Sequence, residues 1–96
     1  IAGGLAALSA ASLPVYGALA TRQSVVAAAD ASALAAADVA VGIAAGFPCE
    51  AASRVAVVNG ASVVSCRLDG LVATVTVSRW ILGIPVTATA TAGPPG

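Results

Sequence analysis

Charged residues are scarce in this chain of 96 residues: they make up 8% of it, against ~25% in typical soluble domains. Lysine is absent, and four arginines balance four acids, so the formal net charge is zero. Electrostatic binding to nucleic acid needs many side chains that neutralise phosphates. Four scattered arginines do not provide them, so we expect no nucleic-acid partner.

Histidine is also absent, which excludes a Ser–His–Asp or Cys–His nucleophile built within the chain. The carboxylates of Asp30, Asp38, Glu50 and Asp69 are too dispersed to predict a paired acid and base. No glycine motif suited to phosphates is present, and two thiolates do not fill the ~4-ligand shell of zinc. We therefore expect no enzyme activity, no cofactor, no metal and no small-molecule substrate.

What the chain does contain is apolar: 59% of its residues are hydrophobic and its mean hydropathy is +1.02. Most of this content is alanine, which favours helix strongly but buries little surface per residue. An alanine-rich helix is thin, so its neighbours can approach it closely. The composition favours dense helix packing over a large globular core.

Residues 1–21 carry no charge, and as a helix they would be ~31 Å long, enough to cross a bilayer core. The sequence starts at Ile1 without an initiator Met or a basic leader, so we expect a processed product that retains its apolar segment. Pro14 predicts a kink. A membrane anchor and a filament core would need the same apolar surface, and the segment fits both.

The helical pattern continues from Arg22 until Gly42 and Gly46, which predicts one helix of roughly 40 residues, about 60 Å long. The rest of the chain is too small to bury such a helix, so it must find partners. Asp30 and Asp38 interrupt one of its sides. The predicted apolar stripe lies on the other side and comprises Leu19, Val26, Ala33, Leu34, Ala37 and Val41.

Residues 47–96 predict a small head. Pro48 favours a short helix near 48–58 that ends at Asn59-Gly60. Three alternating stretches follow, ASVVSCRLDG, LVATVTVSR and PVTATATA, and Asp69-Gly70 between the first two indicates a type I′ hairpin. In the first stretch the alternation assigns one face to Ser62, Val64, Cys66 and Leu68 and the other to Val63, Ser65 and Arg67.

The predicted fold class is therefore α+β: a long kinked N-terminal helix, a short helix and a three-stranded antiparallel meander whose threonine face is the wetter one. We divide the chain into the helix, 1–46, and the head, 47–96. Cys49 and Cys66 form an even pair in a small chain with an apolar leader, which indicates a disulfide and an exported location. Closing that loop would contribute ~3 kcal/mol to a head with little core.

The run AADASALAAA, preceded by Arg22-Gln23, closely resembles actinobacterial TadE-like proteins, small proteins of tight-adherence pilus loci that are related to type IV pilins. The resemblance extends through FPCEAASRVAVVNGASVVSCRLDG to the closing TATATAGPPG, and so covers most of the chain from about residue 20. It implies export, storage in the membrane before assembly, and a type IV pilin-like fold. Type IV pilins usually carry a glutamate near the mature N-terminus; here residues 1–5 contain no acid.

These features together predict a structural subunit of an extracellular pilus or pilus-like filament on the cell surface. Its partners would be further copies of itself, the cytoplasmic membrane before assembly, and, by the resemblance, the pilus assembly machinery. The alternatives are a minor pilin and a monomeric, membrane-anchored surface binding module. The residues expected to pack in the filament core are Leu5, Leu8, Leu13, Pro14, Val15, Tyr16, Leu19, Val26 and Leu34.

Two further groups have both a functional and an ordinary interpretation. Arg22, Asp30 and Asp38 recur at intervals of eight and would set the axial register by ion pairs between subunits, or they are simply solvated. Trp80, Ile81 and Leu82 would form a contact patch on the surface, or they fold over the head as ordinary core.

Overall fold

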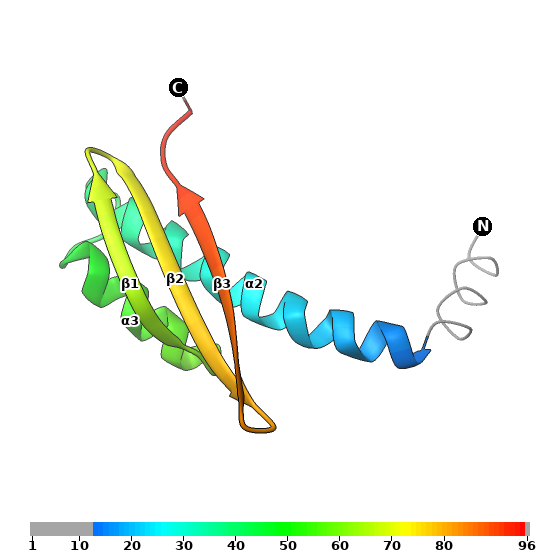
Figure 1. Cartoon of the computed structure of the whole chain (residues 1–96). Helices are drawn as coiled ribbons and strands as arrows, with labels where there is room; N and C mark the ends of the chain where they lie inside the picture. Colours follow the sequence, from blue (N-terminus) through cyan, green and yellow to red (C-terminus); the bar gives the residue numbers. More distant parts are fainter. Residues whose placement is uncertain (1–12, 96) are drawn as a thin grey trace.

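The chain folds into two helices packed against a three-stranded sheet, which confirms the α+β class (Figure 1). The computed structural model describes residues 13–95, and side chains from residue 22 onward. Leu5 and Leu8 lie outside this part of the chain. The elements in order are α2 (Leu13–Ala40), α3 (Pro48–Val58), β1 (Ser62–Asp69), β2 (Val72–Ile81) and β3 (Ile84–Ala92).

A glycine lies two residues beyond the end of each helix, as their sequences predict. After α2, Gly42 has φ +86°, and the amide of Ile43 donates to the carbonyl of Asp38 at 2.9 Å. After α3, Gly60 has φ +76°, and the amide of Ala61 donates to the carbonyl of Ala56 at 2.8 Å. In each case the left-handed glycine lets the chain turn back and satisfy a carbonyl of the last turn.

The sheet is the predicted antiparallel meander in the order β1-β2-β3. Its threonines line the face that points away from the helices, where two cross-strand pairs share hydrogen bonds. Thr76 and Thr89 lie 2.8 Å apart between their hydroxyl oxygens, and Thr74 and Thr91 lie 3.2 Å apart. The opposite face of β2 and β3 is apolar and covered by α2, as the alternation in these strands predicts.

The alternation predicted for β1 is wrong at its start because the strand contains a bulge. Val63 pairs with Val77 and Ser65 pairs with Thr76, so Val64 has no partner and is 63% exposed. An extra residue in one strand shifts every later side chain to the other face. Val63 and Cys66 consequently both pack against the core.

The two hairpin turns also differ from expectation. The β1–β2 loop consists of Gly70 and Leu71, and of these only Gly70 has positive φ, which is the type II′ pattern rather than type I′. The β2–β3 loop is reduced to Leu82 and Gly83, both with positive φ, which is the type I′ pattern. Trp80 and Ile81, which lie between the second and third alternating stretches of the sequence, belong to β2 rather than to the β2–β3 loop.

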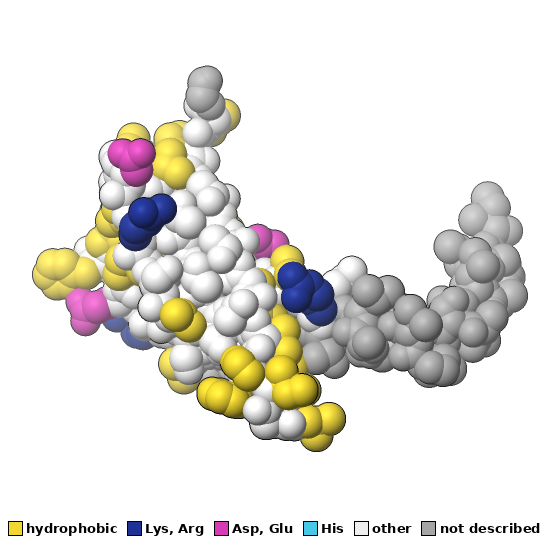
Figure 2. All heavy atoms as spheres, viewed as in Figure 1, with side chains coloured by type: hydrophobic (Ala, Val, Ile, Leu, Met, Phe, Trp, Pro, Cys, Tyr) yellow, Lys and Arg dark blue, Asp and Glu magenta, His cyan; other side chains and the backbone are white. Residues whose placement is uncertain are grey.

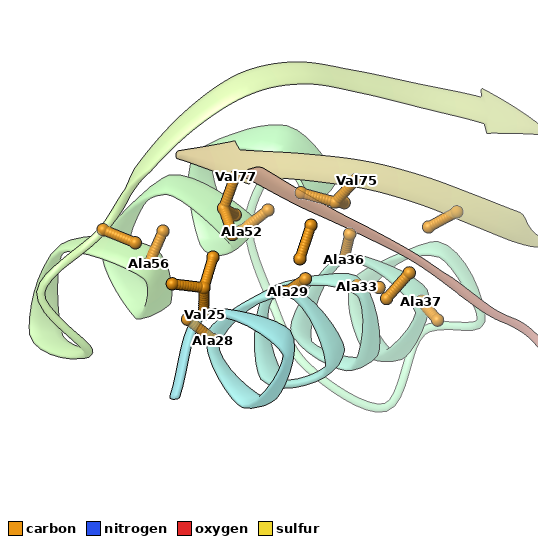
Figure 3. Close-up of a cluster of buried hydrophobic side chains, with 14 residues drawn as sticks. Val25, Ala28, Ala29, Ala33, Ala36, Ala37, Ala52, Ala56, Val75 and Val77 are labelled. Atoms are coloured by element: carbon orange, nitrogen blue, oxygen red, sulfur yellow. The ribbon is translucent and has the colours of Figure 1, made fainter. Parts of the chain in front are cut away.

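Small side chains make up most of the core between α2, α3 and the sheet (Figure 3). From α2 the fully buried positions include Ala29, Ala33 and Ala36, and they face Val75 and Val77 of β2. Because alanine projects only a methyl group, the helix backbone lies close to the sheet. Because of this close approach, many alanines and only a few valines are enough to form one continuous core.

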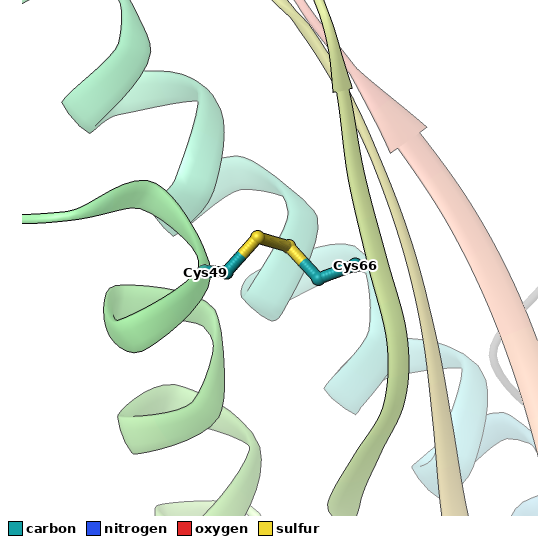
Figure 4. Close-up of a disulfide and its surroundings, with 2 residues drawn as sticks. All are labelled: Cys49 and Cys66. Atoms are coloured by element: carbon teal, nitrogen blue, oxygen red, sulfur yellow. A yellow bond between two sulfur atoms is a disulfide. The ribbon is translucent and has the colours of Figure 1, made fainter.

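The predicted disulfide is present and joins α3 to β1 (Figure 4). Cys49 in the first turn of α3 and Cys66 in β1 have Cα atoms 5.9 Å apart and are separated by 17 residues. The bond crosses from helix to sheet at the side of the head where the contacts between elements are sparsest, since α3 packs mainly on α2 and less on β1. It therefore fixes α3 to a strand that packing alone holds weakly.

Candidate functional site

The outer side of α2, the side that neither the sheet nor α3 covers, is the first candidate surface. Val26 and Leu34, large apolar residues within α2, are 38% and 57% exposed, and Val41, just after the end of α2, is 38% exposed. Gln23, Ala27 and Asp30 share this side and are exposed. Burying an aliphatic side chain of this size contributes ~1.5–3 kcal/mol, so this side would gain stability from a partner.

The apolar stripe predicted for this helix is only partly covered by the rest of the chain. Among its members whose side chains the structure describes, the two alanines are buried, whereas Val26, Leu34 and Val41 are exposed. Asp30, predicted on the opposite side, lies on the same side as Val26 and Leu34, because residues four apart are neighbours on a helix. We call the covered side of α2 the inner side and the exposed side the outer side.

The charged residues proposed to set the register lie on accessible parts of α2. Arg22 and Asp30 are exposed and Asp38 is half-buried. Of the residues proposed to form the filament core, Leu13, Pro14, Val15, Tyr16 and Leu19 lie within α2. Their packing role and the intersubunit ion pairs remain predictions.

A shallow apolar groove of about 450 Å³ lies between the C-terminal end of α2 and the tail that follows β3. Leu34 forms one wall, and Pro94 and Pro95 form the other, with Ile43 at one end. The groove is continuous with the outer side of α2 because Leu34 and Val41 belong to both. No local pattern in the sequence indicates this groove, since Leu34 and Pro94 in its two walls lie 60 residues apart in the chain.

The tip of the β2–β3 hairpin is the second candidate surface, and hydrophobic side chains gather there (Figures 1 and 2). Trp80 is 71% exposed and Leu82 is 97% exposed, whereas Ile81 is half-buried. The interpretation of this segment as ordinary core is therefore wrong for Trp80 and Leu82. Ile84, which the sequence did not single out, is 64% exposed beside them.

A side-chain contact fixes this hairpin relative to α2. Arg79 lies at the tip end of β2, and its Nη1 donates to Oγ of Ser24 at 3.0 Å. The same guanidinium lies beside the end of α3: a Cβ on Gly60 would lie 3.8 Å from its Cζ. Arg79 thus joins β2, α2 and the end of α3 at one place.

The part of the chain that the structure describes contains no group of three or more metal-ligating side chains. Within the same residues, no helix has both the length and the apolar character required to cross a membrane. Comparison with known proteins adds no family assignment: no family model, curated protein or solved structure matches the chain.

Proposed function

We propose that this chain is a pilin-like structural subunit of an extracellular filament, stored in the cytoplasmic membrane and assembled by packing of its N-terminal helices. The observation that supports the proposal is that α2 is covered on one side only. The sheet and α3 of the same chain cover its inner side, whereas Leu34 and Val41 on its outer side are exposed to solvent. A helix that continues from a charge-free segment and keeps an apolar outer side is suited to packing against other helices.

The proposed assembly places the charge-free residues 1–21 in the filament core and the disulfide-linked head outside it. Removal of apolar surface from water, at ~25 cal/mol per Å², would drive the process. Small residues in the segment would allow helices from neighbouring subunits to approach closely. Arg22 would pair with Asp30 or Asp38 of a neighbour and fix the axial stagger.

The test is electron microscopy of material sheared from cells that express either the native chain or Leu34→Asp. We expect thin filaments containing the native chain and a large loss of filaments for the variant, because the substitution places a charge in the helix contact. Val64→Asp is the matched control: Val64 is 63% exposed in the bulge of β1, and its substitution should leave filaments intact. Equal filament yields for Leu34→Asp and the native chain would contradict the proposed packing.

The alternative is a monomeric, membrane-anchored module that displays the head, and the exposed Trp80 favours it as a contact surface. Retention of the native chain in the detergent-soluble membrane fraction, with no filaments in the sheared material, would support this alternative. Asp30→Ala separately tests the register role. An unchanged filament yield and stability for that variant would count against the ion pairs.

A further inference from the structure

We propose that the tip of the β2–β3 hairpin, residues 80–85, inserts into the surface of an anionic phospholipid membrane while the subunit is held there before assembly. The inference rests on the proposed membrane residence of the N-terminal segment. The hairpin tip would then be a second contact with the bilayer, in addition to the N-terminal helix.

The conformation of Leu82 is the first observation. Its φ is +53°, and it is the only described residue other than glycine with positive φ. A type I′ turn normally places asparagine, aspartate or glycine at this position, because a Cβ there comes too close to the following carbonyl oxygen. Leu82 adds to this unfavourable contact a side chain that is 97% exposed. A large apolar residue in this position is unfavourable in water and favourable only if the tip is buried by something else.

The residues around Leu82 enlarge the apolar tip. Trp80 pairs in register with Pro85, and Ile84 begins β3 next to the turn. All three are exposed, and residues 80–96 carry no charge. Tryptophan is enriched where proteins meet the headgroup region of a bilayer, because its ring is apolar and its N–H is polar.

The position of the tip relative to the apolar segment is the second observation. Arg79 contacts Ser24, and Ser24 lies three residues beyond the end of the charge-free stretch 1–21. Beyond Arg79 the strand continues for three residues to Leu82, ~10 Å at the usual rise. The tip and the point where the apolar segment enters the head therefore lie at the same end of the molecule.

The distribution of charge agrees with an anionic surface at this end. Arg79 lies at the tip end of β2, and Arg22 lies two residues before Ser24, which Arg79 contacts, whereas three of the four acids lie towards the opposite end. Asp38 lines the groove at the far end of α2, and Asp69 precedes the β1–β2 turn. Glu50 is in the first turn of α3, whose other end lies beside Arg79. Basic residues next to an apolar anchor are attracted to anionic lipid headgroups.

The experiment uses the full chain reconstituted in vesicles of phosphatidylcholine and phosphatidylglycerol, with bromine-labelled acyl chains as quenchers. Trp80 is the only tryptophan, so its emission reports the tip directly. We expect blue-shifted emission that is strongly quenched by the labelled lipid. The double variant Leu82→Asn with Ile84→Thr should lose most of this quenching, because it removes apolar side chains while Asn-Gly and threonine suit the turn and the strand.

The matched control makes the same changes at the other hairpin, Leu71→Asn with Val72→Thr. Those residues are 48% and 40% exposed and lie at the end remote from Arg79. Quenching should be unchanged in this variant. Quenching that is equally strong in vesicles of pure phosphatidylcholine would show that insertion does not depend on attraction of Arg22 and Arg79 to anionic headgroups. That result would overturn the preference for an anionic membrane.

Extraction with alkaline carbonate separates failure of this inference from failure of the proposed function. If the chain resists extraction but Trp80 is not quenched, the tip does not enter the bilayer and the inference is wrong, while membrane residence stands. If the chain is extracted, the proposed storage in the membrane is itself contradicted. Shielding of Trp80 that depends on the protein-to-lipid ratio would show that a second copy covers the tip, which also overturns the inference.

Discussion

Helix α2 has two sides that follow different rules of packing. The inner side presents Ala29, Ser32, Ala33 and Ala36, and each of them is fully buried between α2 and the elements that cover it, α3 and the sheet. The outer side presents larger residues such as Leu34, and the described chain leaves them exposed. On the inner side most buried residues are small, with Val25 as the exception, and their small size sets the distance between the helix and the elements that cover it. On the outer side apolar area is available, and we assign its burial to other subunits.

The largest expected effect on stability comes from the disulfide that ties α3, which covers part of the inner side of α2, to β1. Replacing both Cys49 and Cys66 by alanine should lower the free energy of unfolding by ~3 kcal/mol, because the open chain regains the entropy of a loop of this length. Thermal unfolding in mild detergent, followed by circular dichroism, measures the change. Reduction of the native chain should reproduce it. An unchanged midpoint in both cases would show that packing alone holds α3 on β1.

A matched pair of substitutions tests the two sides directly. Ala29→Leu should destabilise the fold by ~2 kcal/mol, because the added atoms have no space between α2 and the sheet. Ala27→Leu, two residues earlier and exposed, should change stability by no more than ~0.5 kcal/mol. Urea unfolding of the two variants under identical conditions gives the comparison. Equal effects would mean that the inner side tolerates larger residues and is not defined by size.

The smallest expected effect on stability concerns Ser32, a polar residue among the buried alanines of the inner side. The hydroxyl of Ser32 is fully buried and has no hydrogen-bond partner. Ser32→Ala should therefore stabilise the fold by ~1 kcal/mol, since it removes the cost of burying an unpaired polar group among alanines. Thermal unfolding of the variant against the native chain measures this gain. A loss of stability would indicate that the hydroxyl bonds within its own helix or to water.

Much of the architecture follows from local sequence. The ends of α3 agree with prediction because Pro48 suits the first turn and Gly60 the reversal after the last one. The faces of β2 and β3 agree because strict alternation permits only one assignment of sides. The Cys49–Cys66 bridge agrees because a head of this size has few other sources of stability.

Other features depended on contacts between distant residues. The bulge at Val64 shifts the faces of β1 and arises from its pairing with β2, which no local pattern indicates. The apolar stripe of α2 is only partly covered, because α3 and the sheet pack on one side of the helix, and the residues that do so come later in the chain. The exposure of Trp80 and Leu82 follows from the length of β2, which carries them past the end of the core.

The sequence by itself determined the elements, the order of the strands, the disulfide and the charge-free N-terminal segment, because these depend on spacing, turn residues and composition. Only the tertiary structure decided which side of α2 is covered and which apolar residues remain exposed. The physical reason is that burial is a property of pairs of surfaces. Alanine and leucine are both apolar in a sequence, but only packing shows that the alanines of α2 let the sheet come close and that Leu34 is left more than half exposed.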